Sequence, residues 1–214
     1  MCKNTIEIIE KNKIIVIVRG VAKEKLIPLA EAMYEGGIRA VECTYDATGK
    51  LTDEENAANI EMLVKHFGDR MVIGAGTVLT EKQVELTQKA GGKFIISPDT
   101  NVDVIKTTKR LGLVSIPGSI TPSEVATANR AGADFIKMFP IDFYGPRYLK
   151  TVSTPLSHVR FLAVNGINEN NMTEYLEAGA CGVGVASGIV NKKLIDENNF
   201  EAITELAKKY TEKL

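Results

Sequence analysis

A single lysine interrupts one of the most apolar stretches of this chain. The run from Phe135 to Pro140 places Lys137 among hydrophobic residues, with Gly132 upstream, a pattern typical of a buried strand. Side chains alternate along a strand, so Phe135, Lys137 and Phe139 share one face. Desolvation there lowers the pKa of the ammonium, and a neutral amine can attack a ketone and form a Schiff base. The alternatives are that Lys137 forms a buried structural ion pair, or that its aliphatic chain extends so that the ammonium reaches solvent.

A carboxylate occupies a similar position in an earlier apolar run. Glu42 lies on the opposite face from Val41 and Cys43 in the predicted strand that ends at Thr44. A buried carboxylate needs a partner, and Lys137 is the candidate. Next to a Schiff-base lysine, Glu42 would be the general acid and base, because that chemistry moves protons at several steps. A silent structural ion pair is the other interpretation.

Further polar or small residues fall where predicted strands end. The Arg19 guanidinium could hold a carboxylate or phosphate through its planar fork, or equally form an ion pair at the rim. The glycine-rich turn at 74–80 lets a ligand approach the backbone, with Thr77 as a donor. Residues near the last two strand ends, with their backbone N–H groups, suit a phosphate. The complete set of candidates at strand ends is Arg19, Thr44, Thr77, Pro98, Pro117, Asn165, Gly166, Ser187 and Gly188.

One repeated unit organises the elements that carry these residues: a helix, a glycine, then a short apolar strand. Glycine suits a helix C-terminus, and an apolar run suits a parallel strand buried on both faces. Thr80 with Gln83, and Thr121 with Glu124, have the spacing of capping boxes at two helix starts. The predicted strands are Ile14–Val18, Ala40–Thr44, Val72–Gly76, Phe94–Ser97, Val114–Pro117, Phe135–Phe139, Phe161–Asn165 and Gly182–Ala186.

Strands alternating with helices in this way predict an α/β fold, a (β/α)8 TIM barrel. We expect residues 1–214 to form one domain, with a short N-terminal helix and a C-terminal helix. A doubly wound open sheet is the alternative, but an early GxGxxG or P-loop motif, its usual signature, is absent.

Composition excludes several classes of function. The 214 residues are 44% hydrophobic and 25% charged, with a net charge of −1, so no basic field is available for nucleic acid or an anionic membrane. No apolar run approaches membrane-spanning length, and Met1 to Lys13 has no signal-peptide core. The three cysteines lack CxxC spacing and the two histidines form no metal motif, so we expect neither a disulfide framework nor a metal. A cytoplasmic protein is expected.

A set of short motifs, taken in order, resembles the 2-keto-3-deoxy-6-phosphogluconate (KDPG) aldolase family, which includes 4-hydroxy-2-oxoglutarate (KHG) aldolases. The resemblance runs from about Lys13 to about Gly188. It implies a class I aldolase without metal or cofactor, usually a homotrimer. By motif, Lys137 matches the Schiff-base lysine and Glu42 the acid/base glutamate; Thr77 matches a pyruvate contact, and Pro98 and Pro117 shape the pocket. The motifs are Glu35-Gly36-Gly37-Ile38-Arg39, Val41-Glu42-Cys43-Thr44, Ile73-Gly74-Ala75-Gly76-Thr77-Val78, Ile96-Ser97-Pro98, Ile116-Pro117-Gly118, Thr121-Pro122-Ser123-Glu124 and Ile136-Lys137-Met138-Phe139-Pro140.

Three positions depart from the pattern of the family. Asp46 stands where many members carry an arginine for the keto acid, and we expect Arg19 to supply that cation. Asn165 and Ala186 stand where relatives have glycine near the phosphate. The hypothesis is therefore an aldolase that cleaves a 2-keto-3-deoxy acid to pyruvate and an aldehyde, with a weakened phosphate site. A phosphate-binding barrel isomerase or epimerase with a carboxylate pair, and a non-catalytic sugar-acid binding protein, are the alternatives.

Overall fold

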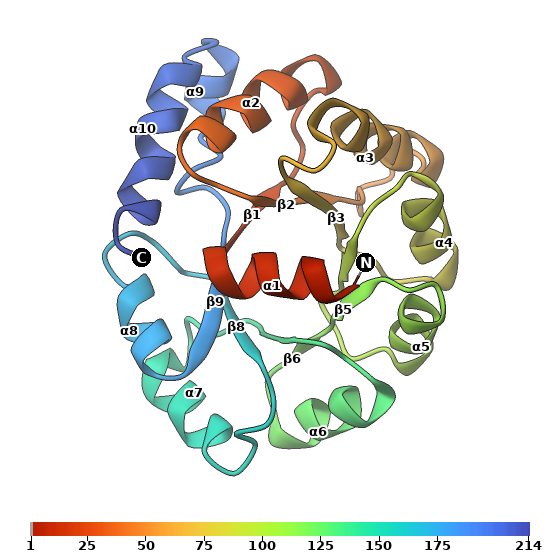
Figure 1. Ribbon diagram of the computed structural model, residues 1–214, viewed down its shortest axis with the longest axis vertical. Helices are drawn as coiled ribbons and strands as arrows, with labels where there is room; N and C mark the ends of the chain where they lie inside the picture. The colour runs from red at the N-terminus through yellow and green to blue at the C-terminus, as the bar shows by residue number, and fades with distance from the viewer. Residues whose placement is uncertain (1) are drawn as a thin grey trace.

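A closed ring of parallel strands, surrounded by helices, forms the protein (Figure 1). The computed structural model describes residues 2–214, with side chains from Asn4 onward. The strands are β1 (Ile14–Val18), β2 (Ala40–Thr44), β3 (Val72–Gly76), β4 (Phe94–Ile96), β5 (Val114–Ile116), β6 (Gly118–Ser119), β7 (Ile136–Met138), β8 (Phe161–Val164) and β9 (Ala180–Val185). The helices are α1 (Cys2–Asn12), α2 (Lys23–Glu35), α3 (Asp53–Phe67), α4 (Glu81–Lys89), α5 (Val102–Arg110), α6 (Pro122–Ala131), α7 (Gly145–Ser153), α8 (Met172–Glu177), α9 (Lys192–Asp196) and α10 (Phe200–Thr211).

The predicted (β/α)8 barrel is confirmed, and one of its eight strands is broken in the middle. β5 pairs with β4, and β6 pairs with β7, so the two short pieces are one strand interrupted at Pro117. Proline has no N–H to donate to a neighbouring strand, which accounts for the break. The Pro117 carbonyl still accepts from Lys137 N at 2.9 Å, and this bond helps to close the ring.

The predicted strand ends were partly wrong. The first three strands match the prediction, whereas β4 stops before Ser97, β8 stops before Asn165, and β7 excludes both Phe135 and Phe139. β9 runs from Ala180 to Val185, two residues earlier at its start and one earlier at its end than expected. At β8 the cause is visible, because Asn165 has a φ of 88° and leaves the extended conformation.

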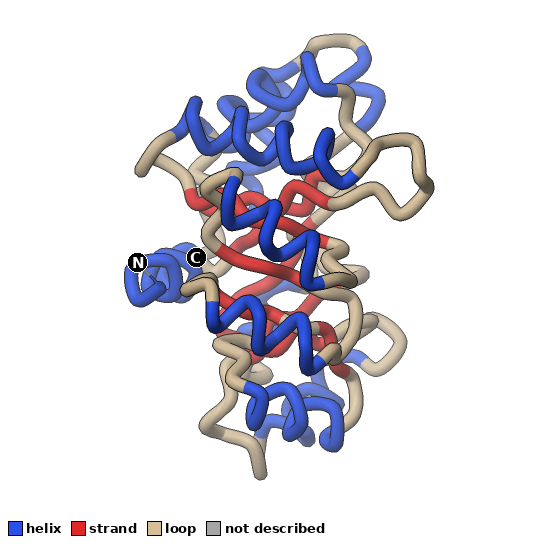
Figure 2. The backbone as a smooth tube through the Cα atoms, turned by 90° about the vertical axis from the view of Figure 1, so that its right-hand side faces the viewer, coloured by secondary structure: helices blue, strands red, loops and turns tan. Residues whose placement is uncertain are grey.

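Apolar side chains fill the structure in two layers. One lies between the ring and the outer helices, and the other fills the interior of the ring. The interior layer includes Ile15, Phe94, Val114 and Phe135, and Ile9 of α1 packs on it. Ile15, Phe94 and Val114 lie at or next to the first residues of their strands, so α1 closes the amino-terminal end of the barrel (Figures 1 and 2). The opposite end, where the strands finish, is left for a site.

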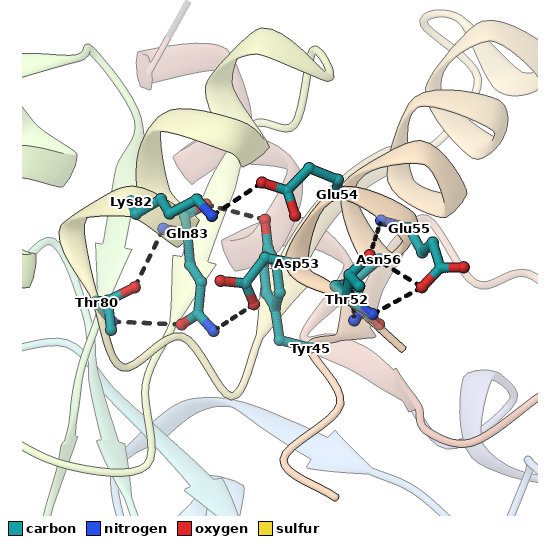
Figure 3. A network of polar contacts seen from close by, with 9 residues as sticks. All are labelled: Tyr45, Thr52, Asp53, Glu54, Glu55, Asn56, Thr80, Lys82 and Gln83. Carbon is teal, nitrogen blue, oxygen red and sulfur yellow. Dashed lines mark hydrogen bonds and ion pairs between the residues drawn. The ribbon is translucent and has the colours of Figure 1, made fainter. Parts of the chain in front are cut away.

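Polar contacts fix the loops that follow β2 and β3 (Figure 3). Both capping boxes predicted from sequence are confirmed, at Thr80–Gln83 and Thr121–Glu124. Gln83 also accepts from Leu79 N at 2.8 Å and donates to Asp53 at 2.9 Å, which joins the starts of α3 and α4. The turn that carries Thr77 is therefore held from behind. No helix within residues 2–214 is both long and apolar enough to cross a membrane.

Candidate active site

Lys137 points into the barrel from β7 and is buried, with 7% of the residue exposed. Its Nζ lies 4.6 Å from the centroid of the Phe139 ring. Burial lowers the pKa of the Lys137 amine, the Arg19 charge lowers it further, and the Glu42 carboxylate opposes both. The environment therefore favours a neutral amine more than water does.

Glu42 is 1% exposed, and a missing side chain makes room for it. β2 pairs with β3, and a Cβ added to Gly76 would lie 1.6 Å from Glu42 Oε1. Any side chain at position 76 would thus displace the carboxylate. Among the described residues Glu42 Oε2 has no hydrogen-bond partner, although it is buried. Burial raises the pKa of Glu42, while the Lys137 and Arg19 charges lower it. A buried carboxylate with a free oxygen is suited to taking up and returning a proton.

Arg19 and Thr77 meet above this pair. Arg19 Nη2 donates to Thr77 Oγ1 at 2.9 Å, which leaves the other guanidinium N–H groups for a ligand. Thr77 has a φ of 56°, a conformation that β-branched residues rarely adopt. Strain of this kind persists only where the surroundings impose it, and the capped start of α4 supplies that support.

A cavity of about 690 Å³ opens at this end of the barrel. Eight of the eleven predicted site residues line it: Lys137, Arg19, Thr77, Pro98, Asn165, Gly166, Ser187 and Gly188. Glu42 lies outside the lining and is covered. Thr44 lines a second cavity of about 440 Å³ beside β1 and β2, and Pro117 is buried in the break between β5 and β6. The structure therefore does not bring Thr44 and Pro117 into the main cavity.

Seven lining residues were not among the predicted site residues: Ile17, Phe139, Val164, Ile167, Asn168, Gly184 and Ala186. Strand alternation could have found Ile17 and Phe139, because each lies two residues after an inward-facing residue, Ile15 and Lys137 respectively. None of the described lining residues is a carboxylate. The carboxylate pair that the isomerase alternative requires is therefore not at this surface.

Backbone N–H groups gather at one side of the cavity. Those of Gly166, Ile167, Ser187 and Gly188 donate to no carbonyl in the described part of the backbone. Asn165 takes the left-handed conformation that asparagine tolerates better than most residues. Ala186 is not among the residues of positive φ, so its methyl group causes no backbone strain. Both departures from glycine are therefore accommodated without loss of the turn.

Asp46 serves its own loop. Its carboxylate accepts from Thr48 N and Oγ1 at 2.9 and 2.7 Å, from Lys50 N at 2.7 Å and from Leu51 N at 3.0 Å. These bonds, led by the one from the Thr48 hydroxyl, lower the pKa of Asp46 to about 2. Asp46 stands where the family resemblance leads us to expect an arginine, and its carboxylate instead stabilises the loop at residues 46–51.

Other chemistries find less support in the described residues. No group of three or more His, Cys, Asp or Glu side chains among them is placed to hold a metal ion. Burial raises the pKa of the Cys43 and Cys181 thiols to about 12, so neither is an activated thiolate. Lys137 is left as the group best suited to nucleophilic attack.

Comparison with known proteins agrees with this geometry. Residues 5–206 match the family model "KDPG and KHG aldolase". The chain is 30% identical to "2-dehydro-3-deoxy-6-phosphogalactonate aldolase" of Escherichia coli (strain K12), over 94% of this chain and 96% of that protein. It is 31% identical to "2-dehydro-3-deoxy-phosphogluconate aldolase" of Treponema pallidum (strain Nichols), over 94% and 93%. A crystal structure of KDPG aldolase from Legionella pneumophila, with pyruvate captured as a covalent carbinolamine, superposes with a TM-score of 0.85 at 31% identity, covering 95% of this chain and 96% of that one.

Proposed function

Because this chain belongs to the KDPG and KHG aldolase family, we propose that it cleaves a 2-keto-3-deoxy sugar acid, phosphorylated at C6, to pyruvate and an aldehyde through a Schiff base on Lys137. The observation that carries the proposal is the pairing of a buried amine of lowered pKa with a buried carboxylate that has a free oxygen. The captured pyruvate of the Legionella protein supports the same first step.

The proposed sequence of steps uses both groups. The neutral Lys137 amine attacks the C2 ketone, and the carbinolamine loses water to give an iminium, with Glu42 supplying and removing protons. Glu42, directly or through a water, then takes the C4 hydroxyl proton. The C3–C4 bond breaks and the aldehyde leaves. The electron pair of the broken bond passes to the iminium, which becomes an enamine. Protonation at C3 and addition of water to C2 release pyruvate and restore the amine.

Arg19 is proposed to bind the carboxylate of the keto acid, in place of the arginine that Asp46 replaces. Arg19→Ala should raise KM roughly 10- to 100-fold, since a charge-assisted hydrogen bond contributes about 1.5–3 kcal/mol. Stability should change little, because the only hydrogen bond described for this exposed side chain is to Thr77. Steady-state kinetics and thermal unfolding check both points. An unchanged KM with a lowered Tm would instead make Arg19 a structural residue of the rim.

A phosphate on the substrate is proposed to bind at Gly166, Ile167, Ser187 and Gly188, whose free N–H groups suit an anion. Among lining residues Arg19 and Lys137 are the cations, so backbone donors carry most of this recognition. We expect kcat/KM to be higher for a phosphorylated substrate than for its unphosphorylated analogue. The measurement is pyruvate release from KDPG, its galactonate-derived epimer, the unphosphorylated forms and 4-hydroxy-2-oxoglutarate. Equal turnover of the unphosphorylated forms would refute the proposed phosphate site and leave the proposed aldolase activity unaffected.

We also propose a cytoplasmic homotrimer, as the family resemblance implies. Phe143 is 80% exposed and Tyr144 is 50% exposed, side by side in the loop after β7, and an apolar pair of this kind is suited to an interface. A designed protein cage built from symmetric oligomeric domains contains a chain that superposes with a TM-score of 0.84 at 28% identity, covering 94% of this chain and 72% of that one. The molecular mass in solution can be measured by sedimentation equilibrium, and a mass equal to that of one chain would refute the trimer.

A further inference from the structure

A buried tyrosine hydroxyl lies near the end of the last helix, close to Glu169 but without a hydrogen bond of good geometry to the described residues. Tyr210 of α10 is 1% exposed, and among the described residues its Oη makes no hydrogen bond of good geometry. Burial, with Glu169 close by, raises the pKa of Tyr210 to about 12, so the hydroxyl keeps its proton at neutral pH. A phenylalanine would fill the same space without burying a polar atom, so the hydroxyl is not explained by packing.

The tip of this tyrosine rests on the turn that lines the cavity after β9. A Cβ added to Gly188 would lie 2.0 Å from Tyr210 Oη and 3.1 Å from its Cζ. Gly188 is not among the glycines with positive φ, so its backbone does not demand glycine. Tyr210 is what requires glycine at position 188, because any side chain there would clash with the phenol.

The helix that carries Tyr210 is firmly anchored elsewhere. Thr204 Oγ1 donates to Ala32 O at 3.0 Å, and Thr211 Oγ1 donates to Gly36 O at 2.8 Å, so α10 is fastened to α2. Beyond the helix, Lys213 Nζ donates to the carbonyl of Glu169, in the loop between β8 and α8. The helix and the residues that follow it therefore contact both loops that contribute free N–H groups to the cavity.

We propose that Tyr210 is a positioning residue for the phosphate end of the site. Its hydroxyl supports the Gly188 backbone from behind and holds the turn at 186–190 so that the N–H groups of Ser187 and Gly188 face the anion. The role rests on the proposed function, since it requires a phosphorylated substrate. It makes recognition of the distal phosphate depend on a helix that contributes no residue to the cavity lining.

Tyr210→Phe is the first test, because it removes one oxygen atom and keeps the ring. We expect kcat/KM for the phosphorylated substrate to fall about 3- to 10-fold, because misalignment of the Ser187 and Gly188 N–H groups would weaken a hydrogen bond to the charged phosphate. The unphosphorylated analogue should be turned over as before. Inhibition by inorganic phosphate should weaken by a similar factor. The matched control is Tyr45→Phe, which loses bonds to Gln83 O and Thr87 Oγ1 outside the cavity and should leave the ratio of the two substrates unchanged.

A double-mutant cycle gives the second test. Gly188→Ala should abolish most of the preference for phosphate in the presence of Tyr210, and Tyr210→Phe should restore part of it by removing the atom that the new methyl group meets. Suppose that the wild-type enzyme prefers the phosphorylated substrate. If Tyr210→Phe keeps that preference, or if the effects in the cycle are purely additive, the role of Tyr210 is overturned and the phosphate site stands. A wild-type enzyme without that preference would overturn the phosphate site and this role with it.

Discussion

Lys137→Met should eliminate aldolase turnover and should leave a folded protein. The methionine side chain occupies most of the lysine's volume and removes the amine on which the covalent step depends. Burial already lowers the pKa of the amine, so a buried charge is not a stabilising feature that the fold would lose. Pyruvate with borohydride should add one reduced pyruvyl group to the wild-type chain and none to the variant, as measured by the intact mass.

The control for this experiment is another lysine of the same barrel. Lys109 forms an ion pair with Asp134 at 2.6 Å and is not among the residues that line the cavity. Lys109→Met should therefore take up the reduced pyruvyl group as the wild type does. Peptide mapping should place the adduct at Lys137. An unmodified wild-type chain under saturating pyruvate would refute the Schiff base and favour a sugar-acid binding protein.

Glu42→Gln should slow turnover by about 10²–10⁴-fold, the contribution expected of general acid–base catalysis. The amide keeps the shape that Gly76 accommodates but can neither take nor return the C4 hydroxyl proton. Adduct formation with pyruvate should persist, although more slowly. Rapid-quench kinetics separates these two steps. Turnover close to that of the wild type would reduce Glu42 to a structural role.

The pH dependence of Glu42→Gln supplies an independent check. The negative charge of Glu42 raises the pKa of Lys137, so its removal should lower that pKa. More of the amine is then neutral at a given acidic pH, and the acid limb of kcat/KM should move to lower pH. The control is Glu124→Gln, which keeps an oxygen to accept from Ile120 N and Thr121 N but removes the charge that strengthens these bonds. It should lower Tm slightly without changing the profile.

Local sequence patterns predicted most of the fold because they report local physics. Apolar runs located β1, β2 and β3 at their correct bounds, and the spacing of Thr80 with Gln83 located a helix start. Strand ends were harder to predict, because they depend on which neighbour supplies the next hydrogen bond. The break at Pro117 is an example, since β5 and β6 bond to different neighbours around the ring.

The candidate site likewise has features that could be predicted from local sequence and features that depend on the tertiary structure. Lys137 stands out as a charge in an apolar run, so its burial could be predicted. The fit between Glu42 and Gly76 arises only when two strands lie side by side, and sequence gives no sign of it. Asp46 was identified from sequence as a replacement for an arginine, but its bonds to residues 48–51 depend on the geometry of the loop and could not be predicted. Tyr210 lies far along the chain from most of the cavity, and no spacing pattern connects them.

The helix across the amino-terminal end of the barrel has a consequence for water. Ile9 of α1 and the packed layer at Ile15, Phe94 and Phe135 close that end, so buried apolar side chains fill the interior below Lys137 and Glu42. The cavity at the open end is the route by which solvent and substrate reach Lys137. In the proposed reaction, a sugar acid lying in the cavity therefore stands between the pair and bulk solvent, which limits the loss of protons to solvent while the carbon–carbon bond is broken. In the same proposed reaction, departure of the aldehyde reopens the route to bulk water, which can then hydrolyse the imine and release pyruvate.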